Sequence, residues 1–178
     1  HTRPSGSLLG LAQVSPFKGP AWAALLLLPT LAERLDALRE PTSRAALLDE
    51  AREHGFRLPP EQIHPMGLAE KPDYDLDSRA SLADLAREAG VDPAELMVDR
   101  LIASEGRELF NGWNFGANLK AQWRLLQSAN CLPGLGDAGA HVGEIVDADS
   151  TTFLLASLAR DRGIMTIPEA VYKLTGMP

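Results

Sequence analysis

Apolar residues recur at helical spacing near the start of the chain. Leu31, Leu35 and Leu38 follow one another at intervals of four and three residues, which places them on one face of a helix. A second helix is expected over residues 41–55, because a Pro-Thr-Ser start signal opens this stretch and a glycine closes it. The pattern therefore predicts that residues 21–56 are mostly helical.

Two further helices are marked by their end residues. Gly90 follows an apolar pattern over residues 81–89 and is a suitable helix terminator. Asp92 is a good N-cap and Pro93 a good first helical residue for a helix over residues 93–104. We expect both helices at these boundaries.

The second half of the chain alternates between strand-like and helix-like segments. Its expected elements are a strand over 107–115, a helix over 117–127, a strand over 131–136, and helices over 151–161 and 168–174. Such alternation is typical of parallel α/β units. Residues 56–77 are rich in proline and predict an irregular, exposed connection that acts as a linker or lid.

Composition narrows the class of protein. The chain has 178 residues, 45% of them hydrophobic, which is enough for a sizeable core. Its net charge of −7 and lack of Lys/Arg clusters disfavour nucleic acid as a partner. The longest apolar run, residues 21–28, is too short to span a bilayer. The single cysteine, Cys131, makes a reducing, cytoplasmic location the default.

The most distinctive segment is the glycine-rich run CLPGLGDAGAHVG at residues 131–143. Its glycines suit a backbone that turns sharply after a strand. Asp137 then lies where a strand ends, which is where parallel α/β barrels place catalytic groups. Aspartate is also a common turn residue that hydrogen-bonds nearby backbone, so the spacing alone leaves both interpretations open.

A wider set of motifs carries a family resemblance. The segment LPGLGDAGAHVGEIVDA at 132–148 is followed by TTFLLA at 151–156, RDRG at 160–163 and PEAVYKLTG at 168–176. Together with RPSGSLLGL at 3–11, these motifs resemble the amidohydrolase superfamily, and within it the N-acyl-D-amino-acid deacylase (D-aminoacylase) branch.

The resemblance implies a fold and a chemistry. Its fold is a (β/α)₈ barrel that carries zinc or another divalent metal, with an aspartate at the end of the last strand. That aspartate matches Asp137, which is expected to take a proton from the attacking water and pass it to the leaving amine, and which is also a possible metal ligand. His141 and Gly139 match positions that shape the site, although a loop histidine hydrogen-bonded to backbone is an equal alternative.

Several family features are missing from the chain. Its histidines are His1, His54, His64 and His141, and none of them are paired at ligand spacing. A catalytic zinc needs about three protein ligands, so the chain alone is expected to bind no metal and to be inactive. The family's substrate-binding arginine is also absent from the loop after Asp137, which leaves the substrate carboxylate without its expected partner.

Other polar and aromatic groups have simpler explanations. Asp73, Asp75 and Asp77 lack the glycine and glutamate of a calcium loop and are expected to be a solvated acidic segment. Trp113, Phe115 and Trp123 could line an acyl pocket but are expected to pack in the core. Cys131 is expected to be a buried, inert thiol, and Glu144 and Asp147 to be capping or surface groups.

These observations predict a helix-rich α/β chain that forms the C-terminal part of a (β/α)₈ (TIM-type) barrel. Its parts are the end of a barrel strand with a loop at 1–19, a helical insertion between late strands at 20–105, and the last strands with closing helices at 106–178. The expected activity is hydrolysis of the C–N amide bond of an N-acyl (D-)amino acid. The alternatives are a cyclic-amide hydrolase of the same superfamily and a catalytically silent helical interaction domain. No membrane partner is expected, and exposed sheet edges favour a homodimer.

Overall fold

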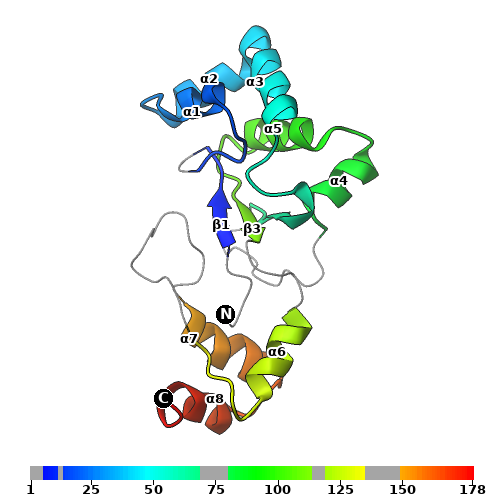
Figure 1. Cartoon of the computed structure of the whole chain (residues 1–178). Helices are drawn as coiled ribbons and strands as arrows, with labels where there is room; N and C mark the ends of the chain where they lie inside the picture. The colour runs from blue at the N-terminus through cyan, green and yellow to red at the C-terminus, as the bar shows by residue number, and fades with distance from the viewer. Residues whose placement is uncertain (1–5, 12–13, 69–79, 114–118, 135–148) are drawn as a thin grey trace. The chain divides into compact units, whose positions relative to one another are not determined.

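The chain has a helix-rich α/β fold. A computed structural model describes residues 6–11, 14–68, 80–113, 119–134 and 149–178. It divides into two compact units, of which the larger is Ser7–Asn114 and the smaller combines His1–Gly6 with Phe115–Pro178 (Figure 1). Each unit is described by itself below. The domain boundaries expected after residues 19 and 105 remain predictions.

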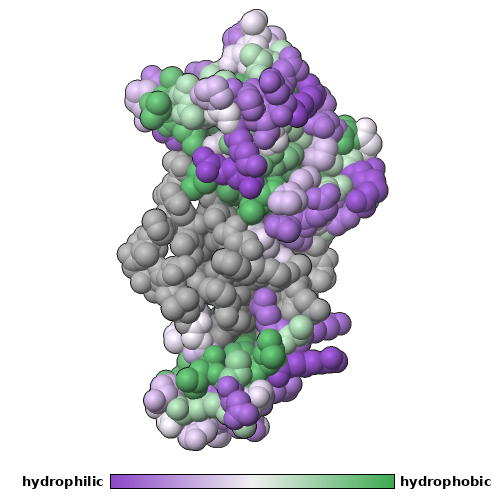
Figure 2. All heavy atoms as spheres, in the orientation of Figure 1, coloured by the Kyte–Doolittle hydropathy of each residue, from purple (hydrophilic) through white to green (hydrophobic). Residues whose placement is uncertain are grey.

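The larger unit contains five helices among its described residues. They are α1 (Pro20–Leu26), α2 (Leu31–Arg39), α3 (Pro41–His54), α4 (Leu82–Ala89) and α5 (Pro93–Ala103). Helices α1, α2, α3 and α5 pack against one another, whereas α4 packs on α5 and on the sheet (Figure 1). On the visible face, hydrophilic residues cover much of the outer surface of these helices (Figure 2), as is usual for helices with one buried side.

The predicted ends of α4 and α5 are confirmed. Gly90 terminates α4 with a left-handed backbone (φ 69°), a conformation that costs glycine little. The Asp92 carboxylate accepts hydrogen bonds from the backbone N–H groups of Ala94 and Glu95, and Pro93 occupies the first position of α5. Local capping chemistry therefore fixes these boundaries, and such chemistry can be read directly from sequence.

The helical stretch predicted over residues 21–56 is three helices instead of two. Pro20 opens α1, and the carboxylate of Glu50, on α3, accepts hydrogen bonds from the first free N–H groups of α1 at Ala21 and Trp22. The Trp22 indole in turn donates to the Leu47 carbonyl of α3 (2.8 Å). The start of α1 agrees with the helical pattern predicted from residue 21, whereas the break between α1 and α2, where Thr30 and Glu33 form a capping box, is not in the prediction.

Three short strands form the sheet of the larger unit, in the order β1 (Gly6–Leu9), β3 (Phe110–Trp113), β2 (Ile63–Pro65). The strand predicted over residues 107–115 is confirmed at Phe110–Trp113, whereas residues 107–109 belong to no strand. The irregular connection predicted over residues 56–77 is wrong in part, because strand β2 lies within it. A 3₁₀ turn, η1 (Pro60–Gln62), leads into β2. With three residues and a terminal proline, β2 is too short for a readable alternation pattern.

Strands β2 and β3 are antiparallel, and their register sorts the side chains between two faces. Ile63 pairs with Gly112 and Pro65 with Phe110, whereas His64 pairs with Asn111 between them. Directly paired residues point to the same side of a sheet. Ile63 and Phe110 belong to the main hydrophobic core. The apolar face of the pair is thus the one that the helices cover.

The smaller unit is helical in its described part. Its elements are α6 (Leu119–Gln127), α7 (Ser150–Phe153), the π-helix η3 (Leu154–Asp161), which continues α7, and α8 (Ile167–Thr175). These match the helices predicted over 117–127, 151–161 and 168–174. Buried side chains of α6, η3 and α8, including Trp123, Leu158 and Ala170, form a second core. Core packing is therefore confirmed for Trp123.

The strand predicted over residues 131–136 is wrong for its described part. Residues 131–134 form no strand, and Cys131 is half-buried instead of buried. The carbonyls of Ser128 and Cys131 both accept hydrogen bonds from the Lys173 ammonium on α8. These bonds hold the segment in a turn after α6. Across the described ranges, no helix has the length and apolar character needed to cross a bilayer.

Candidate functional site

The site residues predicted from sequence, Asp137, Gly139 and His141, lie outside the described residues. The same holds for Phe115 and for the carboxylates at positions 73, 75, 77, 144 and 147. What the structure does describe is the chain on either side of the 131–143 segment, together with the sheet of the larger unit.

The segment that contains Asp137 starts and ends in one helical unit. It follows α6 and the turn up to Gly134, and it leads into α7 after Asp149. Leu126 on α6 and Leu154 at the start of η3 are buried in the same core cluster. Packing within one core therefore fixes both described ends of this segment.

Lys173 is the most constrained charged group on these described ends. It is 7% exposed, and its ammonium donates to the carbonyls of Ser128 (2.7 Å) and Cys131 (3.0 Å). A buried ammonium is stabilised when carbonyl oxygens replace its lost water. Through these bonds α8 holds the backbone six residues ahead of Asp137.

The charged residues near the end of η3 pair locally. Arg160 and Asp161 form an exposed ion pair with Nε and Oδ1 2.6 Å apart. The hydrogen bond from Arg160 lowers the pKa of Asp161, and the same contact raises the pKa of the guanidinium. Arg162 lies over the Trp123 ring, 4.8 Å from its centroid. Each of these groups has a structural role in closing the helix end.

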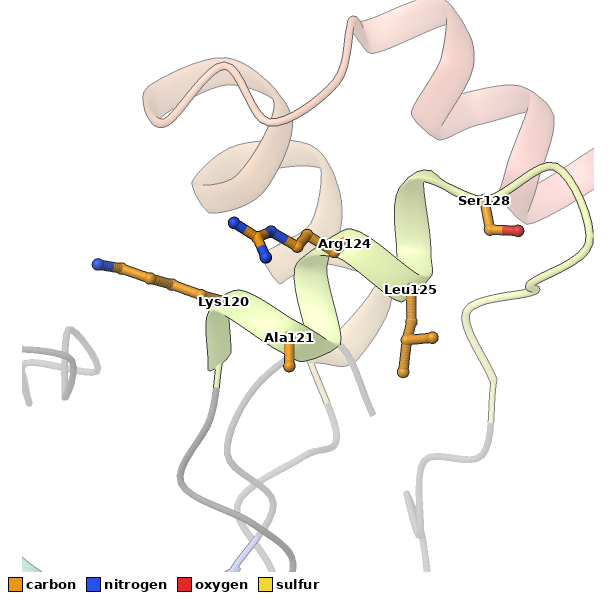
Figure 3. Close-up of a pocket in the computed structure, with 5 residues that line it drawn as sticks. All are labelled: Lys120, Ala121, Arg124, Leu125 and Ser128. Atoms are coloured by element: carbon orange, nitrogen blue, oxygen red, sulfur yellow. The ribbon is translucent and has the colours of Figure 1, made fainter.

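The outer face of α6 borders an open hollow of about 540 Å³. Figure 3 shows that its lining residues Lys120, Ala121, Arg124 and Leu125 project from α6 and that Ser128 lies in the turn after it. These five residues include two cations and a hydroxyl but neither a carboxylate nor an imidazole. The Ser128 hydroxyl also accepts a hydrogen bond from the Asn130 N–H, as a turn residue does. The described lining of the hollow therefore offers neither of the side-chain types most often used for acid–base catalysis.

The second face of the β2–β3 pair is polar and buried, and we call His64, Asn111 and Trp113 the polar face. The three side chains are 6%, 1% and 4% exposed. The rings of His64 and Trp113 stack with their centroids 4.3 Å apart. Neither the amide oxygen and nitrogen of Asn111 nor the indole nitrogen of Trp113 has a hydrogen-bond partner within the described part of the chain.

An ion pair lies just before β3. The buried carboxylate of Glu108 accepts hydrogen bonds from Arg100 on α5, with the Nε–Oε2 distance at 3.0 Å. The Glu108 backbone N–H donates to the Ser104 hydroxyl. These contacts tie the start of β3 to the end of α5. The Arg100 guanidinium is thus already paired with a carboxylate.

Metal binding has no support from the described residues. Across those ranges, no three His, Cys, Asp or Glu side chains come together in a group able to hold an ion. His54 is exposed in the last turn of α3, and His64 lies on the polar face. The described residues do not fit a zinc site, and no chemical step is assigned to a metal below.

Comparisons of the chain with protein-family models, with curated proteins and with solved structures gave no significant match.

Sequence reasoning did not select Asn111 or His64 as site residues. The signal for Asn111 was present, because a polar residue between Phe110 and Gly112 in a buried strand needs a hydrogen-bond partner. The signal for His64 was hidden, since the strand that carries it is three residues long. Trp113, considered for an acyl pocket or the core, stacks on His64 instead of joining either hydrophobic cluster.

Proposed function

We propose that this chain supplies the Asp137-bearing part of a (β/α)₈ amidohydrolase that cleaves the C–N amide bond of N-acyl (D-)amino acids. One observation carries the proposal: the run GLGDAGAHVG at 134–143, with its flanking motifs through residue 176. The helix-rich α/β fold is compatible with it, and so are the helices that precede and follow the run. His141 and Gly139 shape the site beside Asp137.

In the proposed reaction, water attacks the amide carbonyl and Asp137 moves the proton. The carboxylate accepts a proton as the water adds, and it then donates that proton to the amine nitrogen as the C–N bond breaks. The products are a free carboxylic acid and an amino acid, so atoms balance with one water consumed. The metal implied by the family resemblance, zinc or another divalent ion, would need ligands from residues outside this chain.

The proposal includes the oligomeric state of the protein and its location in the cell. A homodimer is expected, and the exposed apolar side chains of Ile167, Val171 and Tyr172 on α8 provide a surface that supports self-association. Figure 2 shows hydrophobic residues on the visible face of the smaller unit. A cytoplasmic location and the absence of a nucleic-acid partner stay predictions.

The test uses the full-length protein as its gene encodes it, assayed with N-acetyl-D-leucine for release of free amine. Asp137→Asn removes the proton acceptor and is expected to lower turnover about 100-fold or more, with the metal content unchanged. Asp149→Asn is the matched control, because Asp149 is an exposed carboxylate at the start of α7. Turnover by Asp137→Asn within twofold of the unsubstituted enzyme would remove Asp137 from this role.

Substrate choice separates the alternatives. Turnover of a hydantoin or dihydropyrimidine instead of N-acetyl-D-leucine would indicate the cyclic-amide hydrolase. No turnover of either class by full-length protein supplied with zinc would indicate the silent interaction domain.

A further inference from the structure

Helix α6 and the turn after it present two rows of side chains to the open hollow beside them. Lys120, Arg124 and Ser128 follow one another at intervals of four residues and form a polar row. Ala121 and Leu125 form an apolar row next to it (Figure 3). All five residues are exposed, and we call them the α6 face. The hollow thus meets a cationic and an apolar strip side by side.

The two cations of the α6 face are unpaired among the described residues. Neither Lys120 nor Arg124 has an ion pair or a side-chain hydrogen bond there. By contrast, Arg44, Arg87 and Arg160 each pair with a carboxylate. The sequence of α6 contains neither Asp nor Glu, and like charges four residues apart slightly disfavour a helix. A bound anion would relieve this repulsion.

Ser128 ends the polar row and is held in place. The buried Lys173 ammonium donates to the Ser128 carbonyl (2.7 Å), which fixes the backbone at this position. The Ser128 hydroxyl accepts from the Asn130 N–H (3.3 Å), so its own O–H can still donate to a further acceptor. A donor on fixed backbone loses little freedom when a ligand binds.

The two rows specify the chemistry of a ligand. An ammonium, a guanidinium and a hydroxyl can all donate to anionic oxygens. The Leu125 side chain is 63% exposed and offers apolar surface beside them. A purely apolar ligand would leave both cations unpaired, and a bare inorganic anion would leave Leu125 uncovered. A hollow of about 540 Å³ is also large enough for a small molecule.

We propose that the α6 face binds a small amphipathic anion. Its carboxylate or phosphate head lies on the polar row, where Lys120, Arg124 and the Ser128 hydroxyl donate to it. Its short apolar tail lies on Ala121 and Leu125. This inference goes beyond the proposed hydrolysis and does not depend on it, because no group of that reaction takes part.

The experiment measures binding to full-length protein by calorimetry. Decanoate carries both head and tail, acetate carries the head alone, and decyltrimethylammonium carries the same tail with the opposite charge. Decyl phosphate distinguishes the two kinds of head group. Tighter binding of decanoate than of decyl phosphate assigns a carboxylate head, and the reverse assigns a phosphate head.

Two variants separate the rows, and a third is the control. Lys120→Gln/Arg124→Gln removes both cations, and Leu125→Gln removes the apolar surface. Lys18→Gln/Arg52→Gln is the matched control, because it changes the net charge equally by replacing two exposed cations of the larger unit. Circular dichroism checks that each variant is folded.

Each ligand and variant has its own expected result. The unsubstituted protein should bind decanoate about tenfold or more tightly than acetate or decyltrimethylammonium. Lys120→Gln/Arg124→Gln should weaken decanoate about threefold or more, and added salt should weaken the unsubstituted protein's binding because exposed charges are screened. Leu125→Gln should weaken decanoate about threefold or more and leave acetate within about twofold. The control should bind decanoate as the unsubstituted protein does.

Three results would overturn the inference. The first is that the unsubstituted protein binds neither decanoate nor decyl phosphate. The second is that it binds decyltrimethylammonium as tightly as decanoate, which would indicate apolar association without recognition of the anion. The third is that folded Lys120→Gln/Arg124→Gln binds decanoate as tightly as the control variant, which would place the ligand elsewhere on the protein.

Discussion

The two faces of the β2–β3 pair are equally buried. They differ in whether their buried side chains find suitable partners, which are packing contacts on one face and hydrogen bonds on the other. On the apolar face, Ile63 and Phe110 are fully buried in a core that the helices of the same unit complete. On the polar face, Asn111 is as deeply buried but has no hydrogen-bond partner among the described residues. Burial alone therefore does not reveal what a face is for. One face contributes stability through packing, whereas the other buries polar side-chain atoms that no described residue pairs.

The largest loss of stability is expected on the apolar face. Phe110→Ala removes a fully buried ring from the core and should lower the free energy of unfolding by about 3–5 kcal/mol. Urea unfolding followed by tryptophan fluorescence measures this loss. Leu27→Ala is the control, because Leu27 is 84% exposed and should be close to neutral. A loss below about 1 kcal/mol for Phe110→Ala would mean that this face is not a packed core.

The next largest loss of stability is expected when the ion pair just before β3 is broken. Arg100→Met leaves the Glu108 carboxylate buried without its partner and should cost about 3 kcal/mol in unfolding free energy. The double variant Arg100→Met/Glu108→Leu removes both charges and should recover most of that loss. Equal stability of the single and double variants would show that the unpaired Glu108 carboxylate is not the cause of the loss.

The smaller unit offers a buried polar group, Lys173, whose side chain, unlike that of Asn111, has hydrogen-bond partners among the described residues. Lys173→Met removes the two hydrogen bonds to the carbonyls of Ser128 and Cys131 and should cost about 1–3 kcal/mol. Hydrogen exchange should report faster exchange at residues 128–131 in this variant, with helix α5 of the larger unit as the internal reference. Unchanged exchange at these residues would contradict the role of Lys173 in holding the turn.

A smaller effect is expected at the start of α4. The hydrogen bond from the Ser81 hydroxyl is the main cause that lowers the pKa of Asp84 to about 2. A depressed carboxyl pKa stabilises the fold above the unfolded-state value of 3.8, and this contribution is lost as the pH falls from there towards 2. Ser81→Ala should cost about 1 kcal/mol at pH 7 and weaken the loss of stability below pH 4. An unchanged acid profile would contradict this coupling.

Sequence predicts features of this fold where the determining chemistry is local. Gly90, Asp92 and Pro93 set helix ends by their own backbone preferences, and those predictions are confirmed. Strand β2 depends on pairing with β3 and left no local pattern, and the cap that Glu50 supplies to α1 comes from a residue distant in sequence. The candidate site divides in the same way. Asp137 is marked by its glycine-rich context, whereas Asn111 is revealed by burial without a hydrogen-bond partner.

The stability of ligand-free Asn111→Leu tests the contrast between the two faces most directly. Since the Asn111 side chain has no hydrogen bonds to lose within the described residues, replacing it with leucine should leave the free energy of unfolding unchanged within about 0.5 kcal/mol or raise it. Urea unfolding beside Phe110→Ala gives the comparison in one experiment. A loss of about 2 kcal/mol or more would show that Asn111 is satisfied within the protein, and the polar face would then be structural.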